Sequence, residues 1–272
     1  MSRPDSLLAY LTRGGRDEVR TAALVGREVD PTLDVESTLE ALEAMAEGLV
    51  VPARADAETA ARALSEHAFG ELGFHGNVGH YYDPANSLLH HVIARRTGIP
   101  ITLAVVFLAL GRKVGLDVVG IGFPGHFLLR VGGPRGVLVD PFHDGRVLGP
   151  EDLGELAERF LGPRVTPGPD HLRPVDAPAL AVRMLGNLEA AYVRVGERGL
   201  AMVTADRLFE LSQDPAHRRD RGMHAHAIGA HTLAAEDLSA YLDARPDAAD
   251  AGQAKAVLTE ARKALRKSQP PN

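Results

Sequence analysis

The chain contains no cysteine among its 272 residues. This absence excludes disulfide bonds, thiolate metal sites and catalysis by a cysteine thiol, and it favours a cytoplasmic location. Long apolar runs are absent too. The longest, residues 101–110, is about half of the 20 or so residues that a membrane-spanning helix needs. The N-terminal segment lacks the basic and apolar regions of a signal peptide. We therefore expect a soluble, cytoplasmic protein with no membrane partner.

The chain also has no basic tract. Its formal net charge is −6, and 24% of its residues are charged. A mildly acidic chain argues against nucleic acid as a partner. The short basic stretch Arg218-Arg219-Asp220-Arg221 is expected to be a solvated, partly self-paired helix face rather than a nucleic-acid site.

The first 99 residues are predicted to be mainly helical. Apolar residues recur at steps of three and four in residues 39–49 and again in residues 57–72. A loop rich in Gly, His and Tyr follows in residues 73–83. Asp83 and Pro84 are then expected to open a helix as its N-cap and its first-turn proline.

The next helix is predicted to be central. It starts at Pro100, and residues 101–110 are apolar on nearly every face. Short β-rich runs follow in residues 118–123, 127–131, 137–139 and 147–148, separated by glycine-containing turns. The fold class is therefore predicted to be α+β, with a helical N-terminal region and a core in which a central helix packs on a small antiparallel sheet. A further helix is expected to begin at Pro150.

A proline-rich segment and a helical array are predicted to follow. Residues 162–178 contain five prolines and are typical of a linker or of an extended segment on the surface. Beyond them, small and apolar positions recur 33 residues apart, near the 34-residue period of tetratricopeptide repeats. We expect domains at residues 1–161 and 179–272. Because two repeats are fewer than the three usually needed for independent stability, the array should dock on the core.

His126 and Asp140 form the most informative pair in the sequence. His126 follows Pro124-Gly125 at the entrance of one predicted strand, and Asp140 closes the next. An antiparallel hairpin would return the carboxylate to the imidazole. The order helix, His, Asp is similar to that of papain-like and transglutaminase-like thiol enzymes, in which a Cys at the helix N-terminus is the nucleophile. Residues 100–102 occupy the stretch where that Cys would lie.

Three motifs extend this resemblance. They are Tyr81-Tyr82-Asp83-Pro84-Ala85-Asn86-Ser87-Leu88-Leu89, Arg95-Arg96-Thr97-Gly98-Ile99-Pro100-Ile101-Thr102-Leu103-Ala104 and Phe123-Pro124-Gly125-His126-Phe127. Together they resemble the SirB-type family of transglutaminase-like proteins, in order and in spacing. The resemblance implies a transglutaminase-like fold followed by tetratricopeptide-like helices. It also implies a family whose members commonly lack the catalytic Cys and to which no firm reaction is attached.

The candidate site follows from the pair and the resemblance. The candidate catalytic residues are His126 as base, Asp140 as its orienting carboxylate and Thr102 as a replacement nucleophile, and the candidate pocket residues are Pro100, Ile101, Phe123, Phe127, Phe142 and Asn86. Each has a purely structural alternative. His126 could satisfy backbone carbonyls, Asp140 could be a turn residue, and Thr102 could bond to the backbone in the first turn of its helix.

No metal or cofactor is expected. The chain has 12 histidines, but their spacings form no recognisable ligand set. Three functions remain open: a non-enzymatic protein-interaction or regulatory protein (a pseudoenzyme), a hydrolase or acyltransferase in which the His126–Asp140 pair activates Thr102 or a water, and, with least support, a metal-dependent enzyme. The sequence favours the first, with a protein partner bound by the repeat array and the core.

Overall fold

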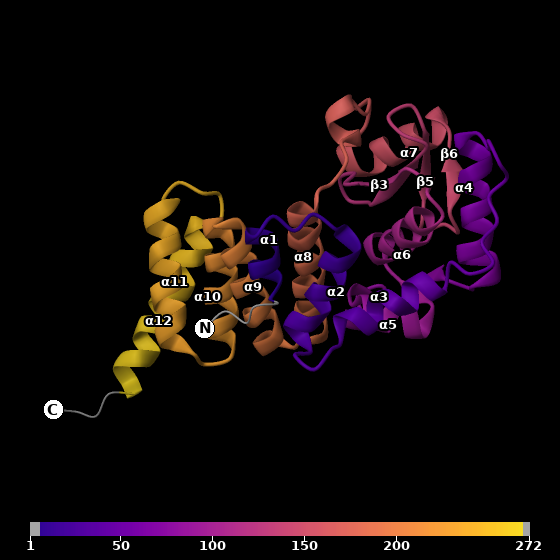
Figure 1. Cartoon of the computed structure of the whole chain (residues 1–272). Coiled ribbons are helices and arrows are strands. Elements are labelled where there is room, and N and C mark those ends of the chain that lie inside the picture. The colour runs from indigo at the N-terminus through magenta and orange to yellow at the C-terminus, as the bar shows by residue number, and fades with distance from the viewer. Residues whose placement is uncertain (1–5, 269–272) are drawn as a thin grey trace. The chain divides into compact units, whose positions relative to one another are not determined.

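The computed structural model describes residues 6–268 of the chain (Figure 1). The N-terminal segment was expected not to be a signal peptide. Its residues 1–5 lie outside the described range. The chain divides into two compact units, residues 1–184 and 185–272. The division falls inside helix α8 (Ala177–Val195), just after the predicted proline-rich linker. Whether residues 162–178 separate two domains stays a prediction.

The first unit begins with short helices, as predicted. They are α1 (Leu7–Thr12), α2 (Glu18–Val29), α3 (Val35–Ala44), α4 (Ala57–Ser65) and α5 (Leu89–Arg95). The first four are capped by the side chains of Ser6, Asp17, Asp34 and Asp56, each of which accepts a backbone N–H. A π-helical stretch, η1 (Glu66–Glu71), continues α4, and a 3₁₀ turn, η2 (Pro84–Ser87), precedes α5.

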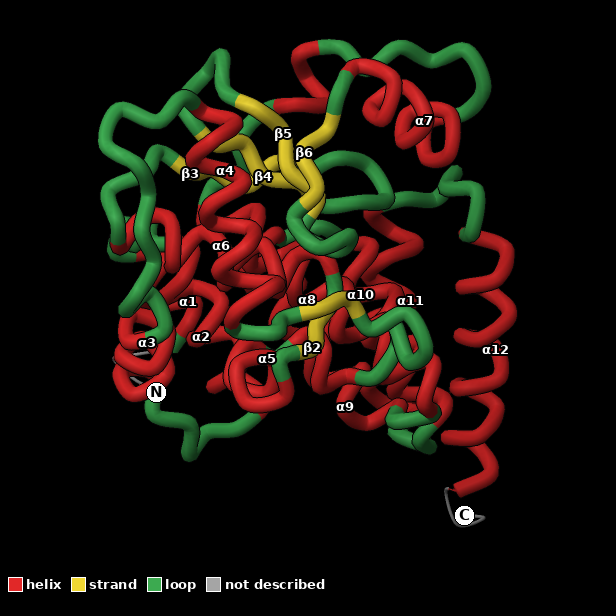
Figure 2. The backbone as a smooth tube through the Cα atoms, turned by 90° about the vertical axis from the view of Figure 1, so that its right-hand side faces the viewer, coloured by secondary structure: helices red, strands yellow, loops and turns green. Residues whose placement is uncertain are grey.

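Helix α6 (Pro100–Lys113) is the centre of this unit. Residues 100–108 are all buried, so the predicted burial of its apolar faces is confirmed. The helix packs on strands β3 (Val118–Ile121) and β4 (Leu128–Val131), and Figure 2 shows it beneath the yellow strands. Truncating one of its large side chains, such as Leu108, would cost about 2–5 kcal/mol of folding free energy.

The sheet is antiparallel and four-stranded, in the order β3-β4-β5-β6. Its strands are β3 (Val118–Ile121), β4 (Leu128–Val131), β5 (Val137–Asp140) and β6 (Arg146–Leu148). The predicted packing of a central helix on a small antiparallel sheet is therefore confirmed. In β4 and β5 Leu129 lies opposite Val139, so the first residues of β4 lie beside the last residue of β5. This register determines where His126 and Asp140 meet.

Two further features frame the sheet. A two-residue parallel pair, β1 (His75–Gly76) with β2 (Thr97–Gly98), connects the 73–83 loop to the start of α6 and had no sequence signal. After α7 (Pro150–Leu161), the proline-rich segment includes the short turn η3 (Pro169–Leu172) and runs along the outer side of β3. There the N–H of Val175 donates to Gly120 O at 2.9 Å. This part of the segment therefore lies on the surface of the first unit.

In the described part of the second unit, every regular element is a helix. It contains the end of α8 and the helices α9 (Arg198–Ser212), α10 (Pro215–Ala227), α11 (His231–Ala244) and α12 (Ala251–Ser268). Consecutive helices from α9 to α12 pack against one another. Gly222 permits close approach, because a Cβ at this position would lie 3.0 Å from Leu238 Cγ. Small residues between paired helices agree with the predicted packing, whereas the tetratricopeptide-like assignment stays a prediction.

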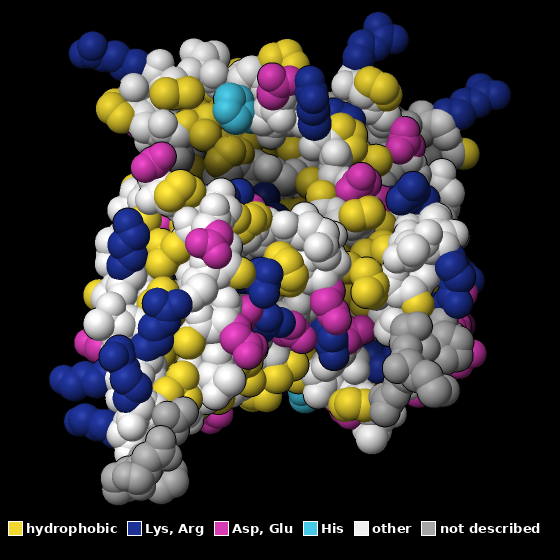
Figure 3. All heavy atoms as spheres, turned by 90° about the vertical axis from the view of Figure 1, so that its left-hand side faces the viewer, with side chains coloured by type: hydrophobic (Ala, Val, Ile, Leu, Met, Phe, Trp, Pro, Cys, Tyr) yellow, Lys and Arg dark blue, Asp and Glu magenta, His cyan; other side chains and the backbone are white. Residues whose placement is uncertain are grey.

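Ion pairs join α10 to its neighbours. Arg218 and Arg221 both bond to Asp237, whose residue surface is 0% exposed, and Arg219 bonds to Asp220 and Asp250. The expected self-pairing of the stretch 218–221 is thus confirmed for Arg219 and Asp220. Lys and Arg side chains are interspersed with Asp and Glu over much of the face in Figure 3. Among the described residues, no helix is both long and apolar enough to cross a membrane.

Candidate functional site

His126 and Asp140 are in direct contact. His126 Nε2 lies 2.9 Å from Asp140 Oδ2, and the two residues are only 7% and 3% exposed. The strand register explains the contact, since β5 ends at Asp140 beside the entrance of β4. The predicted pairing of these residues is therefore present in the structure. Because the carboxylate accepts from Nε2–H, the lone pair of the neutral ring lies on Nδ1, the tautomer that a base requires.

A second histidine shares the same carboxylate. His143 Nδ1 lies 2.8 Å from Asp140 Oδ2, and the backbone N–H of Phe142 donates to Oδ1 at 2.9 Å. Burial raises the pKa of Asp140, but hydrogen bonds and charge from His126 and His143 oppose it, and the net pKa lies below the usual value. Asp140 is thus a buried carboxylate that stays ionised at neutral pH.

The ring of His126 is covered on one face by Phe160 of α7. The two rings are nearly parallel, at 8°, with centroids 6.0 Å apart. Gly125 makes room for this contact, since a Cβ there would lie 2.2 Å from Phe160 Cδ1. Gly125 also has φ +69°, a backbone conformation that favours glycine. The turn before β4 and the end of α7 therefore hold the imidazole together.

Arg183 of α8 fixes the same turn from another side. Its Nη2 donates to Phe123 O at 2.8 Å and also to His126 O, and its guanidinium lies 5.2 Å from the ring centroid of Phe127. Burial lowers the pKa of Arg183 below its ordinary value. Arg183 therefore positions the backbone that carries His126 and does not bond to its ring.

Thr102 is placed as a helix-start residue. Its hydroxyl donates to Asn86 O at 2.7 Å and accepts the N–H of Ile99 at 3.1 Å, and it is fully buried. The proton that a nucleophile would give to His126 is thus bonded elsewhere. Within the described residues, no hydrogen bond joins His126 to residues 100–102. This arrangement favours the structural alternative for Thr102.

Asn86 holds the aromatic loop before η2. Its Nδ2 donates to His80 O at 2.8 Å and to Tyr81 O at 3.1 Å, and its Oδ1 accepts from Asn77 at 3.1 Å. The residue is 0% exposed. Because both amide N–H groups are used, Asn86 has no donor left for a ligand.

The other predicted pocket residues have different surroundings. Pro100 and Ile101 are buried in the first turn of α6. Phe123 belongs to the apolar core with Ile121 and Leu128, and Phe127 is 1% exposed. Phe142 is half-buried and contacts the rings of Tyr81 at 5.8 Å and His143 at 5.5 Å. Phe142 and Tyr81 thus line the approach to His143, while Phe123 and Phe127 support the site from the core.

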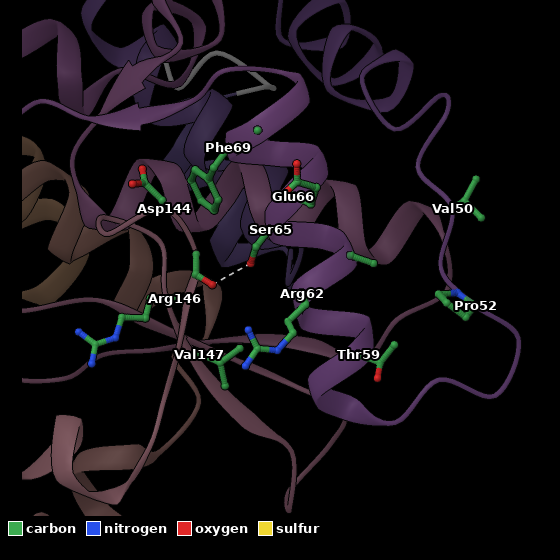
Figure 4. Close-up of a pocket in the computed structure, with 13 residues that line it drawn as sticks. Val50, Pro52, Thr59, Arg62, Ser65, Glu66, Phe69, Asp144, Arg146 and Val147 are labelled. Carbon is green, nitrogen blue, oxygen red and sulfur yellow. Dashed lines mark hydrogen bonds between the residues drawn. The ribbon is translucent and has the colours of Figure 1, made fainter.

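A groove lies next to this site, between α4 and the turn from β5 to β6 (Figure 4). It has a volume of about 1130 Å³. Ser65 bridges the two walls by donating to Gly145 O at 2.8 Å. We call it the α4–β6 groove; its lining residues are Val50, Pro52, Thr59, Arg62, Ala63, Ser65, Glu66, Phe69, Gly70, Asp144, Gly145, Arg146 and Val147. Because Asp144 directly follows His143, one turn serves both the groove and the histidine pair.

Two groups of side chains in the described part of the chain have the spacing of metal ligands. They are His126, Asp140 and His143 in the first unit, and Glu189, His217 and Asp220 in the second. In each, the nitrogen and oxygen atoms lie within 4.8 Å of one another. Sequence spacing did not indicate either group.

Sequence reasoning missed three residues of the site. His143 follows Asp140 by three positions and could have been noticed as a second partner of the carboxylate. Phe160 and Arg183 had no signal, because they reach His126 only through the packing of α7 and α8. Their contacts depend on tertiary structure alone.

The comparisons with known proteins identify the family of the chain. A family model described as the transglutaminase-like superfamily matches residues 34–186. A UPF0162 protein of Xylella fastidiosa (strain 9a5c) is 36% identical over 242 residues, which cover 83% of each chain. One from Vibrio cholerae is 32% identical over 66% of this chain and 67% of the relative. Human F-box only protein 21 is 32% identical over 49% of this chain and 22% of its own length. No solved structure was found to match.

Proposed function

Because this chain belongs to the transglutaminase-like superfamily and contains no thiol, we propose that it is a non-enzymatic, protein-binding member of that superfamily. One observation carries the proposal. At the start of α6, where a nucleophile would stand, the hydroxyl of Thr102 is buried and donates its proton to Asn86 O. A hydroxyl bonded in this way is not poised to attack a substrate.

The α4–β6 groove is the surface that we assign to the partner. Arg62, Glu66 and Arg146 line it, so it presents charges of both signs beside the ring of Phe69 (Figure 4). Mixed charge around an aromatic side chain suits a protein segment better than a nucleic-acid backbone. A partner in this groove would also contact the turn that carries His143.

The test of binding uses a matched pair of variants. The tagged full chain is used for affinity capture from native lysate, followed by mass spectrometry, alongside Arg62→Glu/Arg146→Glu and, as control, Arg135→Glu/Arg164→Glu. Both variants change the net charge equally, and all four arginines are exposed. Partners retained by the wild type and the control but lost by the groove variant support the assignment. Equal capture by all three proteins refutes it.

A second function is favoured by the His126–Asp140 contact: a hydrolase or acyltransferase step in which water replaces the thiol. Nδ1 of His126 makes no hydrogen bond in the described residues, so its lone pair is available to a water. The test is turnover of amide and ester substrates by the wild type and by His126→Ala. Turnover that is lost in the variant and insensitive to iodoacetamide establishes this function and overturns the non-enzymatic one. Inhibition by iodoacetamide in a pure preparation contradicts both, since the chain has no thiol.

Three finer assignments belong to the same proposal. SirB-type membership is supported by the motifs from Tyr81 to Phe127. A tetratricopeptide-like array in residues 179–272 is supported by the packing of consecutive helices α9 to α12 and by the 33-residue recurrence. A cytoplasmic location is supported by the absence of cysteine.

A further inference from the structure

The His126–Asp140–His143 cluster has the donor set of a transition-metal site. His126 Nε2 and His143 Nδ1 lie 2.9 Å and 2.8 Å from the same carboxylate oxygen, Asp140 Oδ2. Two imidazole nitrogens and one carboxylate oxygen are the protein ligands of many catalytic zinc and non-haem iron sites. We propose that this cluster binds a divalent first-row transition-metal ion, with zinc as the expected occupant.

The surroundings of the cluster support the proposal. Oδ1 of Asp140 accepts a hydrogen bond from the backbone N–H of Phe142. This bond orients the carboxylate, as hydrogen bonds to metal ligands do in known metal sites. The remaining nitrogens, Nδ1 of His126 and Nε2 of His143, make no hydrogen bond in the described residues. An ion would therefore replace the two bonds that the three ligands make with one another, and the proton of each ring would move to its other, unbonded nitrogen.

The cluster needs only a small rearrangement to hold an ion. Ligand atoms about 2.0–2.1 Å from a tetrahedral zinc lie roughly 3.3 Å apart, so each ring nitrogen must move away from Oδ2 by about half an ångström. The two ring nitrogens lie within 4.8 Å of each other and must also reach this separation, which would require rotation of the exposed His143 side chain. An ion could reach the cluster from the solvent on the side of His143, because the side chain of His143 is 58% exposed, whereas that of Asp140 is 4% exposed. The open side would leave a coordination position for water.

The second group of potential ligands is a weaker site. Asp220 is already bonded to the guanidinium of Arg219, and Glu189 Oε1 lies 3.0 Å from His224 Nε2. The positive charge of Arg219 already neutralises Asp220, so this group has less need of a metal ion. The first group has no Lys or Arg bonded to its carboxylate in the described part of the chain.

A bound ion would change the chemistry open to this site. Zinc lowers the pKa of its bound water to about 7, which provides a nucleophile without any thiol. The water-activating alternative would then act through the metal rather than through Nδ1 of His126. Binding of the ion does not depend on a partner in the α4–β6 groove, so the two proposals succeed or fail separately.

The test is metal binding by the full chain. Metal-free protein is titrated with Co²⁺, followed by displacement with Zn²⁺, and the visible absorption of tetrahedral cobalt reports the site. We expect one equivalent per chain in the wild type. His143→Asn removes an exposed ligand and leaves the His126–Asp140 pair intact. Loss of a residue that only hydrogen-bonds to a metal ligand weakens metal binding by roughly 10- to 100-fold. Loss of the ligand His143 itself should weaken cobalt binding by at least as much. The control, His91→Asn, changes an exposed histidine of α5 outside the cluster and should bind like the wild type.

Three results would overturn the proposal. One is the absence of saturable cobalt binding in the wild type up to millimolar concentration. Another is equal affinity in the wild type and His143→Asn, with circular dichroism showing both folded. The third is binding that survives His143→Asn but is lost in Asp220→Asn, which would assign the ion to the second group.

Discussion

Asn86 is a buried polar side chain whose hydrogen bonds hold the loop above the site. Its amide donates to His80 O and Tyr81 O, and its backbone carbonyl accepts from Thr102. A buried amide with its bonds made stabilises the fold, and removing it leaves groups unpaired. The motif that contained Asn86 in the sequence thus has a structural role in linking the aromatic loop to α6.

Asn86→Ala should lower the free energy of unfolding by about 1–3 kcal/mol, because the carbonyls of His80 and Tyr81 lose their donors. Urea unfolding measures the change, and near-ultraviolet circular dichroism reports the surroundings of Tyr81 and Tyr82. Asn86→Asp is the matched variant, since it keeps the side-chain shape and an acceptor oxygen but removes both N–H groups. An unfolding midpoint unchanged in Asn86→Ala would contradict the structural role.

Asp140 should make stability depend on pH in acid. Its pKa in the folded chain lies below the unfolded value, because bonds from His126 and His143 outweigh the effect of burial. Its contribution is therefore complete above the ordinary carboxyl pKa of about 3.9 and is lost as the pH falls through the lower folded pKa. The difference in unfolding free energy between the wild type and Asp140→Asn should shrink from pH 7 to pH 3. Asp144→Asn, in the same turn, is the control. A difference that grows towards acid would refute the assignment.

The turn before β4 and the helix α7 depend on each other. Gly125 has φ +69°, and a Cβ there would lie 2.2 Å from Phe160 Cδ1. A side chain added at Gly125 would therefore cost free energy in two ways, through the left-handed backbone conformation and through the clash with Phe160. Gly115 has the first cost without the second, since its φ is +79° and nothing lies within 4 Å of an added Cβ.

Gly115→Ala should accordingly destabilise the chain by about 1–2 kcal/mol, the cost of a Cβ in the left-handed region. Gly125→Ala should cost more, because the ring of Phe160 must also move. Thermal or urea unfolding of the single variants and of Gly125→Ala in a Phe160→Ala background separates the two costs. The excess over Gly115→Ala should vanish in that background. If it persists, α7 does not set the position of the His126 turn.

The two units of the chain differ in how they are stabilised. The first has a central buried helix and a sheet, whereas the second relies on consecutive helices with small residues and ion pairs between them. Two helical repeats are fewer than repeat proteins usually need to fold alone.

Residues 179–272 expressed alone should therefore lack a cooperative thermal transition, while the full chain should show one. Calorimetry measures both. The full chain carrying Asp237→Asn, which removes the ion pairs of Arg218 and Arg221 with Asp237, serves as a reference for a merely weakened array. A monomeric fragment that melts as cooperatively as the full chain would show that the array is an independent domain.

Local patterns predicted a large part of this fold. The apolar stretch after Pro100 predicted the central helix, because only a helix enclosed on all sides is apolar on all faces. The spacing of His126 and Asp140 predicted their contact, because an antiparallel hairpin places one strand's entrance beside the next strand's end. The end of α3 at Ala44 and the β1–β2 pair were missed, since neither has a strong periodic signal.

The absence of cysteine already excluded thiol chemistry, and the hairpin pattern predicted that His126 and Asp140 meet. These conclusions need only composition and short-range periodicity. Three other features became visible only in the folded chain: Thr102 donates its proton to Asn86 O, Phe160 covers the ring of His126, and Arg183 holds the turn that carries His126. The physical reason is sequence distance: these contacts join residues from 16 to 57 positions apart, and their formation depends on how whole elements pack rather than on any local pattern.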